Sequence, residues 1–313
     1  MSVPLTIPQS ARNRFQEGFD RVAQQMQSRF RMYAEVKPGL VGKSTTFKKI
    51  QKREMRDVTG RLQPNVGEEQ LFEHRYLFPK KADLTTILDV DDASELGLQV
   101  APTGEISMEH NSAAMRKLDD YFISGILGTN YEGSEDNIQT VTLPESQIVA
   151  VNYRTDGGSA NTGLTLSKLI QGKGLFGINE VYGQDVEEGG GQICMAVSQQ
   201  ELNNLLENVA QIGSNQYNDV KALVSGTVSE FMGIRFLRTQ RLPRTTPSGG
   251  LIVRSCPMWI STGVRIGFWN DVTTRIDELT NPAGAIQIYS SLRANAHRKD
   301  EDRVVNVLCE QLA

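Results

Sequence analysis

Residues 101–128, APTGEISMEHNSAAMRKLDDYFISGILG, carry the helical pattern that most constrains this chain. Five apolar residues recur at spacings of seven, three, four and four, which places them on one face of a helix. They are Met108, Met115, Leu118, Phe122 and Ile126. A Pro-Thr pair precedes the pattern, and the glycines at 125 and 128 are suited to its end. We therefore predict a spine helix over 102–127, about 20 residues and roughly 30 Å long, against which other elements pack.

Charged residues occupy the opposite side of this pattern. They are Glu109, Arg116, Lys117, Asp119 and Asp120. Arg116 is spaced to pair with both aspartates one turn further on, and such pairs each contribute about 0.2 to 0.5 kcal/mol. We expect this side of the helix to face solvent.

The composition is that of an ordinary globular protein. The chain has 313 residues, of which 39% are hydrophobic and 22% charged, so a sizeable core needs no disulfide or metal. The N-terminus lacks the apolar segment of a signal peptide, and no apolar run reaches the roughly 18 residues of a membrane span. We expect a soluble protein that is neither exported nor inserted in a membrane.

Cysteine and histidine are both scarce. Cys194, Cys256 and Cys309 are odd in number and stand among apolar neighbours, which indicates reduced core residues and a reducing compartment. The three histidines lack the spacing of metal ligands and are interpreted as surface or capping residues. They are His74, His110 and His297.

Charge is distributed unevenly along the chain. The net charge is −4, but residues 1–56 carry twelve basic and four acidic residues, which leaves the remainder at −12. This polarity suits either binding of nucleic acid or contact between the basic end of one copy and the acidic body of another.

The N-terminal region has a second amphipathic pattern. It predicts a helix over Ser10 to Ala34, which packs either as a core helix or as a mobile arm on a neighbour. Its apolar residues are Phe15, Phe19, Val22, Met26, Phe30 and Tyr33.

Residues 43–88 are rich in charge and poor in apolar side chains. Two runs, Thr45 to Val58 and Gln70 to Leu88, flank a turn-rich segment and predict a long hairpin. A hairpin with so little apolar material is marginal on its own. We interpret it as a projecting loop that lies on another surface; the alternative is a solvated hairpin without a partner.

The rest of the chain mixes helices and strands. A polar turn is expected at 129–140, a glycine-weakened helix at 165–181 and a helix from the capping box Ser198 to Glu201 up to Gly213. Strands are expected at 148–153, 193–197, 228–231, 234–239, 251–256, 264–269, 272–279, 286–296 and 303–309. The predicted class is α+β with antiparallel sheets.

Three segments partly match known ligand-binding motifs, but each lacks a residue or a structural context that the motif requires. Gly172 to Gly177 matches GxGxxG but lies inside a helical pattern, and Gly39 to Ser44 lacks the first glycine of a phosphate loop. The acidic run from Asp89 to Asp92 lacks the glycine and closing glutamate of a calcium loop. We predict no catalytic residues, no cofactor and no metal, and therefore no enzyme.

The order of elements carries a resemblance. The segments are the amphipathic arm, the charged hairpin KSTTFKKIQKREMRDVTGRLQPNVGEEQLFEHRYLFPKKADLTTILDVDD, the spine, LTLSKLIQGKGLFGINEV, CMAVSQQELNNLL, VSEFMGIRFLRTQRLP, RIGFWNDVTTRIDE and GAIQIYSSLRANAHRKDEDRVVNVLCE. Together they resemble the major capsid protein of tailed double-stranded DNA bacteriophages, with the Hong Kong ninety-seven-type fold.

The resemblance implies a domain plan. Residues 1–40 correspond to an N-terminal arm and 41–88 to an extended loop. Residues 89–182 and 263–313 correspond to a peripheral domain with the spine helix 102–127, and 183–262 to an axial domain.

The resemblance also implies a function. Homo-hexamers and pentamers would close into an icosahedral shell in the virion, assembled in the cytoplasm of the host bacterium. It would enclose double-stranded DNA without reading its sequence, with portal and scaffolding proteins and in some phages a decoration protein as partners. Each extended loop lies over the adjacent subunit.

Candidate inter-subunit residues follow from the charged hairpin. They are Lys48, Lys49, Lys52, Arg53, Arg56, Arg61, Glu68, Glu69 and Glu73. Single exposed pairs contribute only about 0 to 1 kcal/mol, but a shell repeats them many times. Alternative functions are the shell of an encapsulin-like compartment and a non-specific nucleic-acid-binding protein, although aromatic residues are not interleaved with the basic ones as in the latter.

Overall fold

The computed structural model describes residues 24–55, 57, 60, 67, 69, 72–88, 104–134, 137–182, 191–210, 229–246, 250–279 and 285–311. Within these ranges the chain forms three sheets and three α-helices, with four short 3-10 turns. The helices are α3 (Glu105–Leu127), α4 (Leu166–Ile178) and α5 (Gln199–Ala210). The 3-10 turns are η1 (Arg31–Tyr33), η2 (Glu145–Gln147), η3 (Ser261–Gly263) and η4 (Glu301–Arg303).

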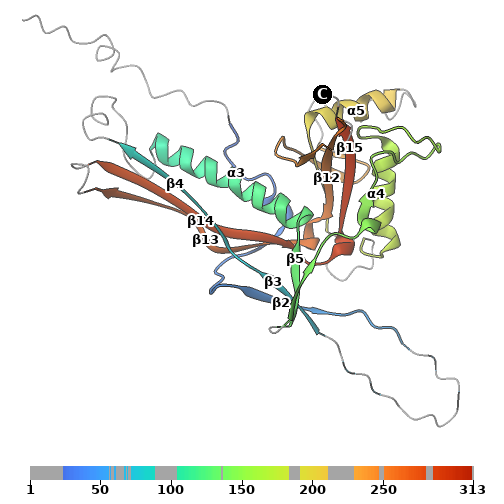
Figure 1. Cartoon of the computed structure of the whole chain (residues 1–313), viewed down its shortest axis with the longest axis horizontal. Coiled ribbons are helices and arrows are strands. Elements are labelled where there is room, and N and C mark those ends of the chain that lie inside the picture. The colour runs from blue at the N-terminus through green and yellow to red at the C-terminus, as the bar shows by residue number, and fades with distance from the viewer. Residues whose placement is uncertain are drawn as a thin grey trace, which may run out of the picture.

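The spine sheet, in the order β1-β13-β14-β4, lies along α3 (Figure 1). Its strands are β1 (Glu35–Lys37), β4 (Lys80–Leu88), β13 (Val264–Glu278) and β14 (Ile286–Arg298). The strands predicted at 264–269 and 272–279 are one strand, β13, whose register shifts between Phe268 and Thr273. The break in alternation is therefore a β-bulge rather than a turn.

The seven-stranded sheet forms the second half of the body, beside α4 and α5 (Figure 1). Its order is β7-β15-β12-β8-β10-β9, with β11 paired to β12. The strands are β7 (Ile148–Val149), β8 (Ile193–Val197), β9 (Glu230–Phe231), β10 (Ile234–Arg238), β11 (Arg244–Thr245), β12 (Ile252–Ile260) and β15 (Val304–Gln311). β15 lies in this sheet, although the expected domain plan grouped its residues with the spine helix.

The third sheet, β2-β3-β5-β6, carries the predicted hairpin, which projects from the body (Figure 1). Its strands are β2 (Thr45–Ile50), β3 (Phe72–Leu77), β5 (Asn130–Ser134) and β6 (Asn137–Val141). The predicted second run, Gln70 to Leu88, is divided at Phe78-Pro79, and β4 pairs with β14 instead. The polar turn expected at 129–140 is wrong: β5 pairs with β3, whose ladder supplies the stability that these polar residues lack.

The expectation of antiparallel sheets is also corrected. β1 pairs with β13, β8 with β10 and β7 with β15 in parallel. Parallel pairs join segments far apart in sequence, and alternation along one strand contains no information on its partner's direction.

The length of α3 agrees with the predicted spine, but Gly125 has a different role from the one expected. It lies inside the helix, where a Cβ would stand 2.4 Å from the carbonyl oxygen of Ala296 on β14. Gly128 is the residue that ends the helix. Gly125 therefore permits close contact between α3 and the spine sheet.

Three aromatic rings join α3 to the N-terminal segment and the seven-stranded sheet. Phe30 stacks on Phe122 at 5.0 Å between ring centroids, and Trp259 meets Phe122 edge-on at 5.2 Å. The Trp259 indole N–H donates to the carbonyl oxygen of Tyr33 (2.9 Å). All three rings are buried, so this cluster unites elements from the beginning, middle and end of the chain.

The predicted N-terminal helix is wrong over residues 24–34; the part before residue 24 lies outside the described residues. Residues 24–30 form an irregular segment that precedes η1. This segment binds Asp119 on α3 through side-chain and backbone groups: the Ser28 hydroxyl donates to the carboxylate at 2.6 Å and the Arg29 amide at 3.2 Å. A carboxylate that takes backbone and hydroxyl donors favours extended chain over a helix at this point.

The same contact corrects the predicted solvent face of α3. Asp119 is fully buried, and Arg116 pairs with Glu109 (3.2 Å) instead of the two aspartates. Asp120 accepts from Arg241 at 2.6 Å. Lys117 is exposed, as predicted, so only part of the charged side is covered. Helical periodicity does not reveal that Asp119 is buried by another part of the chain.

A buried lysine fastens α4 to the seven-stranded sheet. Lys168 is fully buried, and burial lowers the pKa of its amine. The ammonium donates to four carbonyl oxygens, those of Val151 (2.8 Å), Thr162 (2.7 Å), Gly163 (3.0 Å) and Leu308 (2.9 Å). These bonds connect the loop before α4, α4 itself and β15.

Other local expectations have mixed outcomes. The capping box is confirmed, since the Ser198 amide donates to the Glu201 carboxylate at 2.9 Å, and all three cysteines are free and buried. The surface interpretation is wrong for His110 and His297, which are buried.

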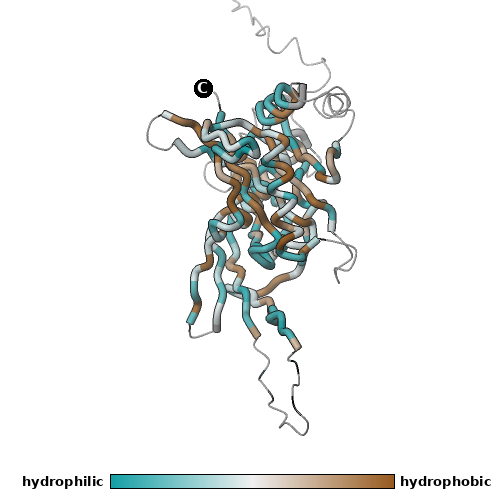
Figure 2. The backbone as a smooth tube through the Cα atoms, turned by 90° about the vertical axis from the view of Figure 1, so that its right-hand side faces the viewer, coloured by the Kyte–Doolittle hydropathy of each residue, from teal (hydrophilic) through white to brown (hydrophobic). Residues whose placement is uncertain are grey.

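Apolar segments gather in the body, where the elements pack together (Figure 2).

Replacing Phe122 by alanine should remove the centre of the aromatic cluster. We expect the free energy of unfolding of the unassembled chain to fall by about 3 to 5 kcal/mol, as measured by urea denaturation. The control is Phe72→Ala, which deletes an exposed ring. Equal losses in the two variants would contradict the role of the cluster.

Lys168→Met keeps the volume of the side chain but leaves its four carbonyls without their donor. The carbonyls of Val151 and Thr162 still accept from the backbone amides of Thr162 (3.1 Å) and Glu310 (2.9 Å). We therefore expect a loss of about 1 to 3 kcal/mol, the cost of a buried acceptor left without its donor. Lys173→Met in the same helix removes a half-buried lysine that donates to one carbonyl, that of Met232 (2.9 Å), and should cost about 1 kcal/mol or less. Thermal melts of both variants give the comparison.

Candidate assembly surfaces

The projecting hairpin contains the predicted contact residues. β2 and β3 pair from Thr45 with Leu77 to Ile50 with Phe72. The structure describes Lys48, Lys49, Lys52, Arg53, Glu69 and Glu73, whereas Arg56, Arg61 and Glu68 lie outside the described residues.

The outer part of the hairpin is mostly solvated within the single chain. Lys48 is exposed. Lys52 meets Glu180 at 3.2 Å, with both side chains more than three-quarters exposed. Arg53 donates to the backbone carbonyl of Glu69, across the hairpin.

Apolar side chains of the hairpin are also uncovered, a feature that the sequence analysis missed. Ile50 is 65% exposed and Phe72, its cross-strand partner, is 59% exposed. Met55 is exposed further along. Neighbouring apolar residues that find no cover within the chain are typical of an interaction surface, and their position opposite one another was the available signal.

The base of the hairpin makes ion pairs within the chain. Lys49 lies 3.3 Å from Asp300 and 4.0 Å from Glu73, so two predicted contact residues have partners in their own subunit. Arg75, which the sequence analysis did not select, is buried and donates to Glu301 at 2.7 Å. These bonds orient the hairpin relative to η4.

The predicted packing face of α3 is divided by the structure. Leu118, Phe122 and Ile126 are buried, and Met115 packs against the core. Met108 is 37% exposed, because the first turns of α3 lie beyond the seven-stranded sheet and reach only the outer end of the spine sheet (Figure 1).

A family comparison decides what this architecture is. The model of a family described as phage capsid protein matches residues 7–311. The chain belongs to the phage capsid protein family. It is a structural protein of the phage shell, and no curated protein sequence matches it.

Solved capsid structures share the fold at low sequence identity. The capsid of Ralstonia phage GP4 matches with a TM-score of 0.68 at 11% sequence identity. The match covers 100% of this chain and 98% of the Ralstonia phage chain. The capsid of cyanophage Pam1 has a TM-score of 0.65 at 11% identity, covering 93% and 94%. Mycobacterium phage Ogopogo gives 0.61 at 14% identity, covering 93% and 94%. The predicted Hong Kong ninety-seven-type fold is confirmed.

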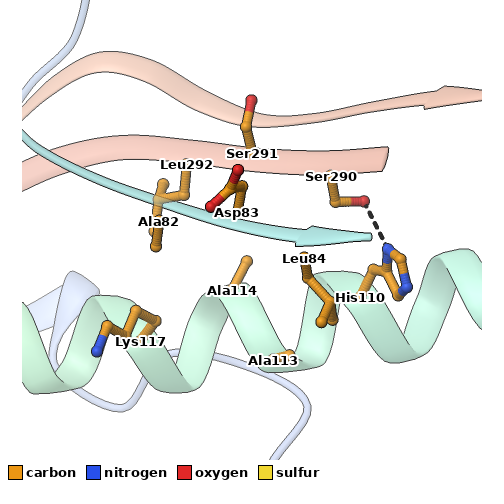
Figure 3. A pocket seen from close by; sticks show the side chains of 10 residues that line it. All are labelled: Ala82, Asp83, Leu84, His110, Ala113, Ala114, Lys117, Ser290, Ser291 and Leu292. Atoms are coloured by element: carbon orange, nitrogen blue, oxygen red, sulfur yellow. Dashed lines mark hydrogen bonds between the residues drawn. The ribbon is translucent and has the colours of Figure 1, made fainter. Parts of the chain in front are cut away.

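A pocket of about 210 Å³ lies between α3, β4 and β14 of this capsid protein (Figure 3). Its lining includes His110, Ser290 and Asp83, the residue types of a nucleophilic triad. His110 is held instead between two hydroxyls, Ser290 Oγ (3.0 Å) and Thr86 Oγ1 (2.8 Å), while Asp83 accepts from the Tyr289 hydroxyl (3.5 Å). Burial lowers the pKa of His110. Because the imidazole lacks an orienting carboxylate, the arrangement holds α3 on its sheet.

The described part of the chain offers no group of metal-binding side chains. Among the same residues, no helix is both long and apolar enough to cross a bilayer.

Two glutamates share a site beside Arg75 in the hairpin sheet. Burial and a hydrogen bond with Glu73 raise the pKa of Glu132 to about 7, against the attraction of Arg75, which lies 3.3 Å away. The same hydrogen bond lowers the pKa of Glu73. The pair therefore holds one proton in mildly acidic solution and releases it around neutral pH.

Glu132→Gln should change how stability depends on pH. The ordinary pKa of this glutamate is 4.5, and its pKa in the folded chain is about 7. Between these two pH values the folded chain keeps a proton that the unfolded chain has released, so the free energy of unfolding falls as the pH rises. The variant should gain on the order of 2 kcal/mol relative to the wild type across this interval. Urea denaturation at a series of pH values measures it.

Glu73→Gln is the matched control for that series. It removes the neighbouring carboxylate but leaves the burial of Glu132, so the pH slope should decrease without vanishing. A wild-type slope in the Glu132→Gln variant would contradict the assignment.

Proposed function

We propose that this phage capsid protein assembles into a closed shell by laying its β2/β3 hairpin over an adjacent copy. The observation that carries the proposal is the uncovered hairpin, where Ile50 and Phe72 lie beside exposed basic side chains. A two-stranded projection with one apolar patch gains stability only when another surface covers it. The acidic remainder of the chain suits the basic hairpin as that surface.

The assembled form that we propose is an icosahedral shell of homo-hexamers and pentamers around double-stranded DNA. Family membership supports this form. Aromatic residues are not interleaved with the basic ones, which argues against a nucleic-acid-binding module. Portal and scaffolding proteins, and in some phages a decoration protein, are the proposed partners. Assembly takes place in the host cytoplasm, and no enzymatic step or cofactor is proposed.

The domain plan is retained as a proposal with one adjustment. Residues 1–40 act as the arm and 41–88 as the extended loop, of which β4 is the edge strand of the spine sheet. α3 and the β13/β14 hairpin form the core of the peripheral domain. β15 and α4 are assigned to the axial domain, because β15 pairs with β12 in the seven-stranded sheet and α4 packs against β15.

Charge reversal on the hairpin tests the proposal. The double variant Arg53→Glu with Arg56→Glu should fold as the wild type does but should not form closed shells, because like charges then face the acidic partner surface. Size-exclusion chromatography followed by negative-stain electron microscopy, with and without a candidate scaffolding protein, gives the result. Normal particles from this variant would exclude the hairpin from assembly.

The conservative double variant Arg53→Lys with Arg56→Lys keeps both charges and is the control; it should assemble. The content of purified wild-type shells tests the second part of the proposal. Nuclease-resistant DNA in particles from infected cells is expected, whereas a protein cargo would indicate an encapsulin-like compartment.

A further inference from the structure

A second pocket lies where the hairpin meets the body. It measures about 220 Å³ and is formed by β2, the adjoining ends of β13 and β14, and the turn that leads into η4. We call it the base pocket. Its lining residues are Phe47, Lys48, Lys49, Ile50, Arg75, Arg265, His297, Lys299, Asp300 and Arg303.

The lining of the base pocket is strongly cationic. Six of its residues are lysine or arginine, and Asp300 is the only carboxylate among them. Asp300 already accepts from Lys49 at 3.3 Å. Glu301, which stands behind the lining, is engaged by Arg75 at 2.7 Å and lies 3.5 Å from Arg298.

A single glutamate, Glu35, forms ion pairs with three cations on the opposite wall of the pocket. The Glu35 carboxylate lies 3.1 Å from Arg265, 3.0 Å from Lys299 and 3.0 Å from Lys37. Burial opposes its ionisation, but these three bonds outweigh burial and hold the pKa of Glu35 at about 2. Lys49 also lies 4.0 Å from Glu73, and Arg75 lies 3.3 Å from Glu132. The lining itself nevertheless holds six cations against one carboxylate and is therefore cationic.

A buried histidine with unused hydrogen-bonding groups completes the pocket. His297 is 1% exposed, and neither ring nitrogen has a hydrogen-bond partner among the residues that the structure describes. Its ring stacks on Phe47 at 5.1 Å, while the Arg265 guanidinium covers the same phenyl ring at 4.3 Å. Burial, Arg265 and Arg75 lower the pKa of His297 to about 3, so the neutral ring has one N–H to donate.

We propose that the base pocket is a binding site for one oxyanion. An oxyanion would accept hydrogen bonds from the His297 ring and the surrounding ammonium and guanidinium groups, and its charge would offset the surplus of cations. The volume exceeds the roughly 30 Å³ of a single water and accommodates a carboxylate or a phosphate. Bound there, the anion would fix the hairpin to the sheet and so set the direction in which it projects.

Two sources share this chemistry: a carboxylate side chain from a second copy of the chain, and a free phosphate ion. The binding site itself follows from the pocket alone. Occupation by a second copy rests on the proposed shell function, so the two parts are tested on separate material.

Inorganic phosphate is the probe for the unassembled full-length chain. At constant ionic strength set with chloride, phosphate should raise the melting temperature in proportion to the logarithm of its concentration, and the phosphorus-31 resonance should broaden. His297→Phe keeps the stack on Phe47 but removes both ring nitrogens, and Lys48→Gln removes the exposed cation at the rim. Each variant should bind phosphate at least tenfold more weakly.

Lys43→Gln, an exposed lysine outside the lining, is the matched control and should bind as the wild type does. If His297→Phe fails to fold, Lys48→Gln still decides the outcome. The proposal is overturned if phosphate has no effect beyond that of chloride, or if the pocket variants bind as tightly as the control.

The same titration on assembled shells distinguishes the sources. Stabilisation of the unassembled chain but not of the shell indicates that a neighbour's carboxylate fills the pocket after assembly. Stabilisation of both indicates a free ion. If no shell forms, the unassembled chain still reports on the oxyanion site, so failure of the proposed function and failure of the site remain distinguishable.

Discussion

The stacking of Phe30, Phe122 and Trp259 is the contact on which the arrangement of this chain depends. Each ring comes from a different part of the sequence, and α3 supplies the central one. Because the cluster is buried, α3 is held at its C-terminal half by the seven-stranded sheet and the N-terminal segment. The N-terminal half of α3 extends along the spine sheet (Figure 1).

α3 also lies in close contact with the spine sheet. The absence of a side chain at Gly125 lets α3 approach β14, and the buried Asp119 then fastens residues 28 and 29 across the other side of the helix. The long helix and the long strands of the spine sheet are thereby held together along their length. Such a rigid frame suits a shell protein, because it fixes the hairpin and the seven-stranded sheet at a set distance from one another.

The hairpin shows the opposite balance. Its base is bonded to the body through Arg75 and Lys49, whereas its outer residues have little to pack against within one subunit. The described bonds between the hairpin and its own subunit therefore lie at its base, and contacts with a second subunit are proposed for its outer part. The base pocket lies at that boundary, which is why an anion bound there would affect the direction of the hairpin more than the stability of the core.

The sequence by itself determined the elements whose signals are local: the long helix, the capping box of α5, the helical context of Gly172 to Gly177 and the order of segments that resembles a phage capsid protein. Helical and strand periodicities, capping residues and turn residues act over a few positions, so they are readable without a partner. The tertiary structure alone decided which polar residues are covered, as with Asp119, Lys168 and His297, and which strands pair in parallel. It also decided that residues 24–34 are not helical and that β4 and β15 join sheets other than those expected. These outcomes depend on donors and acceptors brought together from distant parts of the chain, and no local pattern contains that information.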